Sequence, residues 1–82
     1  MTKKERYKFI GKLAIALESQ KIQITLSSLN KILKDKDFAC GNNRGLAKVV
    51  KTSYDYFKED NKKISKAIAN TFTNKYGKLA WK

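Results

Sequence analysis

The part of the sequence best suited to binding chemistry is residues 40–51, which read CGNNRGLAKVVK. Asn42, Asn43 and Arg44 stand there between two glycines, directly before an amphipathic helical pattern. Asparagine caps the free N–H groups of a first helical turn, and the partial positive charge of a helix N-terminus favours phosphate. Asn and Arg also pair bidentately with the edges of adenine and guanine. The stretch is therefore either a helix cap alone or a helix cap that also contacts nucleic acid.

Basic residues continue along the helix that this stretch begins. Arg44, Lys48 and Lys51 recur at i, i+4 and i+7, so they share one helix face, and the first turns of the helix contain no acidic residue. Lysine is a compact, hydrated charge that suits phosphates, whereas arginine also reads base edges. We expect Lys48 and Lys51 to contact phosphates on either side of a DNA groove. Further cations expected to contact the same nucleic acid are Lys21, Lys75 and Lys78.

The net charge of the chain points to an anionic partner. Its 82 residues carry 19 Lys and Arg against 7 Asp and Glu, a net charge of +12, and this excess repels itself in a folded molecule. A polyanion or an acidic protein would offset the repulsion. Rows of lysine are nevertheless solvated helix faces in most proteins, and the sequence leaves open whether the rows on different helices converge.

Catalytic and metal-binding chemistry finds little support in the same sequence. Histidine is absent and Cys40 is the single cysteine, which excludes a disulfide within the chain and the usual zinc sites. The run DKDFACGNNRG resembles a calcium-binding loop at Asp35 and Asp37, but it lacks the third acid and the closing glutamate. We therefore expect neither an enzyme, nor a cofactor, nor a metal site.

The elements that must position these residues are predicted to be mainly helical. The sequence has no proline and only four glycines, so few positions force the chain out of a helix. Apolar periodicity and capping residues predict helices over about residues 3–19, about 27–34, from about 43 to the break at 59–61, and from there to about 72. Alternation in residues 21–25 predicts a short strand, and residues 79–81 are expected to be its antiparallel partner.

Helical spacing also predicts which side chains form the core. We expect Thr25 or Ser27 to cap the second helix, and Phe38 to fold back from the loop that follows it. Phe9 and Trp81 are assigned to the core as well. The residues expected to face inward from the helices are Tyr7, Ile10, Leu13, Ala14, Leu17, Leu26, Leu29, Ile32, Leu33, Leu46, Val49, Val50, either Ser53 or Tyr54, Phe57, Ile64, Ala67, Ile68, Thr71 and Phe72.

Together these elements predict one compact domain over residues 1–82, mainly α in class, with four helices and a short two-stranded β element. A chain of this length supports a single core. Helix-turn-helix and winged-helix domains read DNA with the N-terminal residues of a recognition helix, a role that we assign to the helix beginning near Asn43. The loop before that helix has about eight residues, whereas the tight form has about 3 to 4. The looser winged-helix-like arrangement is therefore favoured.

The second half of the chain, residues 41–81, resembles a group of small bacterial and mobile-element proteins. The shared pattern begins with GNNRGL, continues through a tyrosine-rich helix, and ends in A-x-x-F-T-x-x-x-G-x-x-A-W. The resemblance implies no activity. The pattern positions that it marks are Arg44, Gly45, Phe72, Gly77 and Trp81. Packing or turn geometry explains Phe72, Gly77 and Trp81 better than it explains Arg44.

We therefore expect a binding protein. The leading prediction is a small double-stranded DNA-binding module, for instance a transcriptional regulator, that uses the N-terminus and basic face of the third helix. RNA is less favoured, because the sequence lacks the runs typical of the common RNA modules. The alternative is a protein-interaction module, such as a phage- or plasmid-encoded inhibitor, that presents the same basic surface to an acidic protein.

Two further expectations concern the compartment and the assembly of the chain. No window has the apolar length of a membrane span, and the basic N-terminal segment lacks the continuous apolar run and cleavage site of a signal peptide. A cytoplasmic protein without membrane contact is therefore predicted. A homodimer would double the few base contacts that one unit offers, and the sequence leaves this arrangement open.

Overall fold

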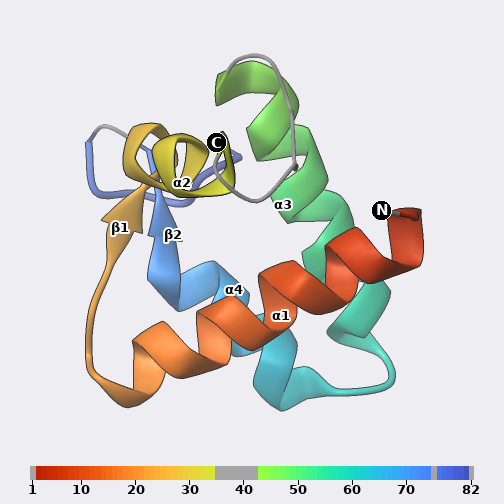
Figure 1. Cartoon of the computed structure of the whole chain (residues 1–82). Helices are drawn as coiled ribbons and strands as arrows, with labels where there is room; N and C mark the ends of the chain where they lie inside the picture. Colours follow the sequence, from red (N-terminus) through yellow and green to blue (C-terminus); the bar gives the residue numbers. More distant parts are fainter. Residues whose placement is uncertain (1, 35–42, 75, 82) are drawn as a thin grey trace.

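Helices account for most of the structure, a computed structural model that describes residues 2–34, 43–74 and 76–81. Over these residues the helices are α1 (Lys3–Ser19), α2 (Leu26–Lys34), α3 (Asn43–Lys58) and α4 (Lys62–Thr71), and the strands are β1 (Ile24–Thr25) and β2 (Phe72–Thr73). The expectation of a mainly helical chain with four helices and a short two-stranded β element is confirmed (Figure 1). Within the described part of the chain, no helix combines the length and the apolar character that crossing a bilayer requires.

Local hydrogen bonds set both ends of α1. Thr2 Oγ1 accepts a hydrogen bond from the backbone N–H of Glu5 at 3.2 Å, and the Glu5 carboxylate accepts one from the N–H of Thr2 at 3.3 Å. This N–H holds the pKa of the exposed Glu5 carboxyl below its usual value. At the other end, Lys21 takes φ +57°, and the N–H of Ile22 donates back to the carbonyl of Leu17 at 3.0 Å. The predicted range of this helix is confirmed.

Side-chain caps also set the starts of α2 and α4. Thr25, the first of the two caps expected for α2, accepts a hydrogen bond from the N–H of Ser28 at 3.3 Å. The helix accordingly begins one residue earlier than expected. Asn61 caps α4 by accepting from the N–H of Ile64 at 3.3 Å. The break predicted at residues 59–61 therefore works as a helix start.

The two strands pair differently from the sequence prediction. β1 and β2 run parallel, with Ile24 opposite Phe72. The expected antiparallel pairing of residues 79–81 with the first strand is therefore wrong. Leu79 instead forms an isolated antiparallel bridge with Thr73 in β2.

The turn after β2 explains this difference. The Oδ1 atom of Asn74 accepts hydrogen bonds from the N–H groups of Tyr76 at 2.8 Å and Lys78 at 3.1 Å. Gly77 takes φ +76°, a conformation that other residues rarely adopt. The chain reverses within these few residues, so the C-terminal segment meets β2 before it can reach β1. The remaining edge of β2 pairs with β1.

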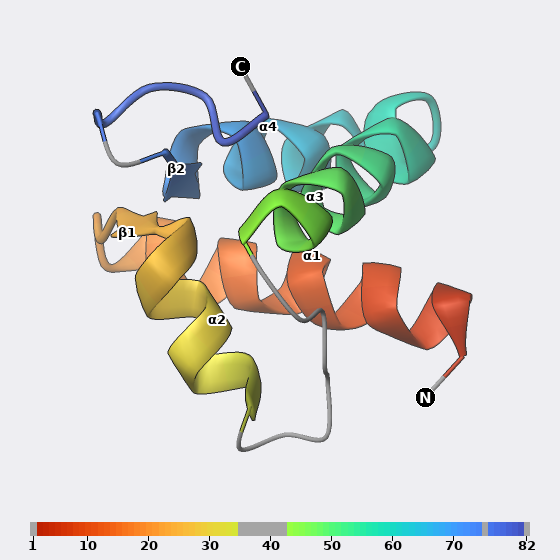
Figure 2. The same cartoon turned by 90° about the horizontal axis from the view of Figure 1, so that it is seen from above.

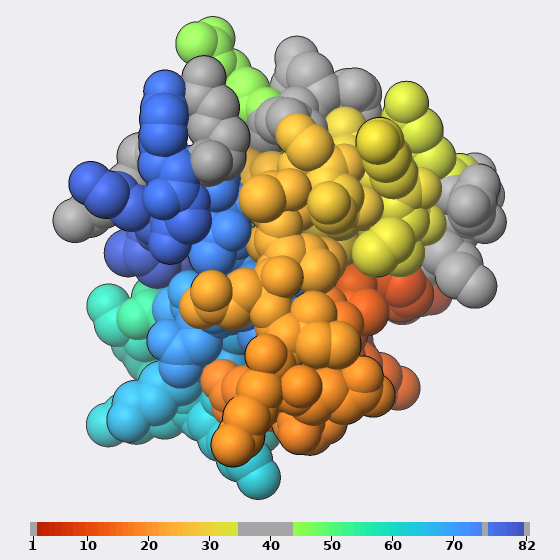
Figure 3. Space-filling view, turned by 90° about the vertical axis from the view of Figure 1, so that its left-hand side faces the viewer, coloured from red at the N-terminus to blue at the C-terminus, as the bar shows by residue number. Residues whose placement is uncertain are grey.

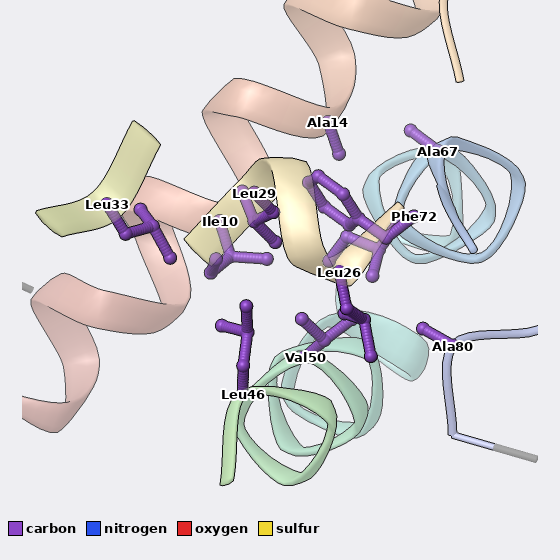
Figure 4. Packing of buried hydrophobic residues seen from close by; sticks show 11 residues of the cluster. Ile10, Ala14, Leu26, Leu29, Leu33, Leu46, Val50, Ala67, Phe72 and Ala80 are labelled. Atoms are coloured by element: carbon purple, nitrogen blue, oxygen red, sulfur yellow. The ribbon is translucent and has the colours of Figure 1, made fainter. Parts of the chain in front are cut away.

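One cluster of buried side chains joins the four helices and the C-terminal segment (Figure 4). Its members are Ile10, Ala14, Leu26, Leu29, Leu33, Leu46, Val50, Ala67, Ile68, Phe72 and Ala80. The prediction that Ile32 faces inward is wrong, because three leucines already fill the inner face of the short α2, and Ile32 is 41% exposed. Phe9 and Trp81 are partly buried against the cluster, and Phe38 lies outside the described residues.

Helices α1, α3 and α4 pack on one another, while α2 packs on α3 and on the two strands (Figures 1 and 2). The Thr71 hydroxyl donates to the carbonyl of Ala14 at 3.3 Å, which joins α4 to α1. On the face seen in Figure 3, the segment between α1 and β1 lies against α4, and the Gln23 side chain donates to the carbonyl of Asn70 at 2.9 Å. This packing leaves one side of α3 facing solvent.

Candidate nucleic-acid interface

Helix α3 divides its side chains between the core and the solvent. Leu46 and Val50 are fully buried, whereas Arg44, Lys48 and Lys51 are exposed. The helical repeat therefore turns the predicted basic row away from the core. The N-terminal end of α3 is not covered at Arg44, the position on which the DNA-binding prediction depends most.

The outer face of α3 borders a shallow hollow of about 610 Å³, which we call the α3 hollow. Its lining residues are Arg44, Ala47, Lys48, Lys51, Ala80 and Trp81. The short side chain of Ala47 leaves room beside the helix, and the C-terminal segment supplies the facing wall. The Trp81 ring lies 5.2 Å from the Tyr54 ring at an interplanar angle of 42°, a contact that holds the indole in place. The cations of α3 therefore border an aromatic surface.

A second hollow, of about 220 Å³, lies where the start of α1 meets α3. Its lining includes Lys3 and Arg6 from α1 and Gly45, Lys48 and Thr52 from α3. Lys48 lines both hollows, so the cations of the two helices form one continuous surface. We call this surface the basic face; its members are Lys3, Arg6, Arg44, Lys48 and Lys51.

The charges of the basic face are only partly offset by acidic groups. Lys51 Nζ lies 3.0 Å from Asp55 Oδ2, with the two side chains 53% and 51% exposed. An ion pair this exposed contributes about 0–1 kcal/mol and exchanges readily for another anion. Among the described residues, neither Arg44 nor Lys48 has an ion-pair partner. Within the basic face, a carboxylate of the described residues therefore offsets Lys51 but neither Arg44 nor Lys48.

Sequence reasoning missed Lys3 and Arg6. The cations of α1 with the regular i, i+4, i+8 spacing are Lys4, Lys8 and Lys12, and neither Lys3 nor Arg6 belongs to that row. The structure turns a different side of α1 toward α3, and Lys3 and Arg6 are on that side. The i, i+3 spacing of Lys3 and Arg6 indicated that they share a helix face. Which neighbouring helix that face meets is not a local property of the sequence.

The other predicted contact residues are placed less favourably or not at all. Lys21 is exposed but lines a separate hollow with Glu18, Gln23 and Asn70, so a carboxylate shares its surroundings. Lys78 is exposed in the turn after β2. The structure brings neither of them into the two hollows of the basic face.

For three of the predicted contact residues the structure gives little or no information about position. Asn42 and Lys75 lie outside the described residues. Asn43 is the first residue of α3, as expected. Its place at the tip of the helix keeps it next to Arg44.

No known family model, curated protein or solved structure matches the chain. The resemblance of residues 41–81 to small bacterial and mobile-element proteins therefore stays a prediction. The structure gives physical roles to most of its pattern positions. Phe72 is fully buried, Gly77 has a positive φ, and Trp81 packs on Tyr54. Arg44 has no such role, since its side chain is exposed.

Proposed function

We propose that this chain binds double-stranded DNA through the basic face, with α3 as the recognition helix. The observation that carries the proposal is the exposed pair Arg44 and Lys48. These side chains lack an ion-pair partner among the described residues and stand beside Lys3 and Arg6 of a second helix. A cationic surface built from two elements suits a polyanion whose charges follow one another at short intervals.

In this mode of binding the start of α3 enters a major groove. Arg44, next to the helix tip, reaches the base edges or the nearest phosphates, where the helix dipole adds to its charge. Lys48 and Lys51 contact phosphates beside the groove, and Lys3 and Arg6 contact the neighbouring backbone. Asn43, the first residue of α3, and Asn42, which precedes it in the sequence, remain candidates for contacts with the same DNA. No chemical step belongs to this function.

The finer assignment is a small regulator of winged-helix-like type. In such domains the third helix carries base contacts and other elements contact the flanking backbone. Here α3 carries the base contacts, and the start of α1 contacts the flanking backbone in place of a wing. Most of the contacts are lysines to phosphate, so we expect affinity to exceed sequence selectivity in a single unit. A symmetric pair of chains would add the selectivity that one unit lacks.

Fluorescence polarisation with a labelled random-sequence duplex tests the proposal. We expect micromolar or tighter binding at low salt, and a slope of log affinity against log salt of roughly −4 to −5, as for about five phosphate contacts. The double variant Arg44→Gln with Lys48→Gln should bind at least about tenfold more weakly. Glutamine keeps the helix propensity of the positions that it replaces.

The matched control is Lys62→Gln with Lys63→Gln, which removes the same charge from exposed positions on α4. Its affinity for the duplex should remain close to that of the unaltered chain. Equal losses in the two variants would show that net charge alone drives binding, and no binding at low salt would end the proposal. Preference for a poly(dT) single strand over the duplex would also contradict it, because cations beside an aromatic ring suit unpaired bases.

A further inference from the structure

A third hollow lies on the other side of α1 and differs from the basic face in its chemistry. It has a volume of about 320 Å³ and an apolar floor formed by Gly11, Ile15 and Ala16 of α1. The opposite wall is formed by Phe57, near the end of α3, and by Ile64, near the start of α4. We call this hollow the α1 groove. Its volume is at the lower end of the range for ligand sites, which is enough for a few apolar side chains.

The missing side chain of Gly11 allows this groove to form as it does. A Cβ atom at Gly11 would lie 2.9 Å from Ile64 Cγ2 and 2.9 Å from Phe57 Cε2. Any other residue would therefore force the Ile64 and Phe57 side chains, or α1 itself, to shift. The absence of a side chain at Gly11 therefore lets α1 approach Phe57 and Ile64 closely, and these residues form the groove that an apolar partner would meet.

Two lysines stand at the edge of the α1 groove. Lys8 and Lys12 line it from consecutive turns of α1, and both side chains are exposed. Like charges at i and i+4 destabilise a helix slightly when nothing offsets them. The nearest acid on the same helix is Glu5, whose pKa is lowered most by the hydrogen bonds with Thr2 and least by the charge of Lys8. Among the described residues, no ion pair engages Lys8 or Lys12.

We propose that the α1 groove docks an acidic amphipathic helix of another protein. Large apolar side chains of that helix enter between Ile15, Phe57 and Ile64, and its carboxylates pair with Lys8 and Lys12. Apolar anchors with flanking charges are the usual chemistry of a helix bound in a groove. Charge decides between this partner and a second copy of the chain. A symmetric contact between two such grooves would bring the same lysines of two strongly basic molecules together.

The docking surface is distinct from the DNA-binding surface. The α1 groove shares no lining residue with the two hollows of the basic face. Around α1, Arg6 and Lys8 point roughly 160° apart, because successive helical residues turn by about 100°. Loss of DNA binding would therefore leave the α1 groove intact, and loss of peptide binding would leave the basic face intact. Both surfaces can be occupied on one molecule, so an acidic protein can join the chain while it holds DNA.

Selection from a phage-displayed library of random peptides tests the proposal whatever the identity of the partner. Peptides enriched on the full chain should carry Leu, Ile, Met or Phe at i, i+3 or i+4 and i+7, with Asp or Glu between them. A synthetic peptide of that consensus should perturb the amide signals of Gly11, Ile15, Ala16 and Ile64 in two-dimensional NMR spectra. The signals of Arg44 and Lys48 should stay in place.

Two variants separate the charged and apolar parts of the site. Lys8→Gln with Lys12→Gln should weaken the peptide by about tenfold, as for the loss of two partly exposed ion pairs. Ile15→Gln should weaken it by a similar or larger factor, and a circular dichroism melt checks that this variant still folds. Arg44→Gln with Lys48→Gln is the matched control and should bind the peptide as the unaltered chain does.

Other results would contradict docking of an acidic helix in the α1 groove. Absence of enrichment over a blank surface, or a consensus without acidic residues, would overturn the proposal. Equal peptide affinity in the unaltered chain and in Lys8→Gln with Lys12→Gln would overturn it as well. Concentration-dependent dimers in sedimentation experiments, abolished by Ile15→Gln, would assign the groove to a second copy of the chain instead.

Discussion

Helices α1 and α3 carry cations at the same helical spacing, but the two rows border different surfaces. On α3, Arg44 and Lys48 line a hollow that Trp81 closes and that the cations of α1 extend. On α1, Lys8 and Lys12 line an apolar groove between helices. Helical spacing places cations on one face of a helix. The element packed beside that face determines which kind of ligand the cations can help to bind. If the two regions are separate, a substitution in one of them should leave binding at the other unchanged.

The largest effect is expected at the glycine that shapes the α1 groove. Gly11→Leu should lower the free energy of unfolding by about 2 kcal/mol, because overpacking at Phe57 and Ile64 outweighs the gain in helix propensity. Urea unfolding followed by circular dichroism measures it. Ala16→Leu, at an exposed position of the same helix, should change stability by no more than about 0.5 kcal/mol. Equal effects of the two substitutions would mean that α1 does not approach its neighbours so closely.

A second experiment compares the two lysine rows directly in DNA binding. Replacement of Arg44 and Lys48 by glutamine should make the salt dependence of duplex affinity shallower by about 2 in slope, since two phosphate contacts are lost. Replacement of Lys8 and Lys12 by glutamine removes the same charge and should leave the slope nearly unchanged. Titrations at several salt concentrations give both slopes. Two equal slopes would show that the rows act as one diffuse field.

The single tryptophan reports on the same distinction without any substitution. Trp81 lines the α3 hollow and is absent from the lining of the α1 groove. Duplex DNA should quench or shift its fluorescence, whereas a peptide in the α1 groove should leave the emission as it was. A change of Trp81 fluorescence with the peptide would mean that the peptide binds near the α3 hollow. An unchanged fluorescence at saturating DNA would mean that the duplex binds elsewhere.

The smallest effect is expected at the ion pair on α3. Asp55→Asn removes the carboxylate 3.0 Å from Lys51 Nζ and should change the unfolding free energy by no more than about 0.5 kcal/mol, since the pair is exposed. The freed Lys51 should strengthen duplex binding by about two- to fivefold. Polarisation titrations at low salt resolve a change of this size. A weaker complex would show that Asp55 positions Lys51 for DNA instead of competing for it.

Much of the fold was predictable because short stretches of sequence determine where helices begin and end. Thr2 with Glu5 caps α1, Asn61 caps α4, and the apolar repeat indicated the inner faces of the helices. The strand pairing was not predictable in the same way. Residues 79–81 have the composition of a partner for β1, but the turn at Asn74 and Gly77 delivers them to β2 first. Pairing between strands far apart in the sequence depends on which strand edge each segment reaches first. No short stretch of sequence contains that information.

The candidate site was predictable only in part for a related reason. Arg44, Lys48 and Lys51 share a face of one helix, so spacing alone brought them together. Lys3 and Arg6 join them through the packing of α1 on α3, which depends on the whole core. The α1 groove was missed because Gly11 looks like a weak point in a helix, whereas in the structure it is a point of contact.

The parallel pairing of β1 with β2 has a consequence for the order of events during protein synthesis. Ala14 and Thr71, which are hydrogen-bonded, are 57 residues apart, and Ile24 pairs with Phe72 in the same region. While the first half of the chain leaves the ribosome, α1 therefore emerges long before α4 exists to receive it. We expect the contacts of α4 and β2 with α1 and β1 to form in one late step, after translation of β2, because the long loop between them cannot close until its far end has been made.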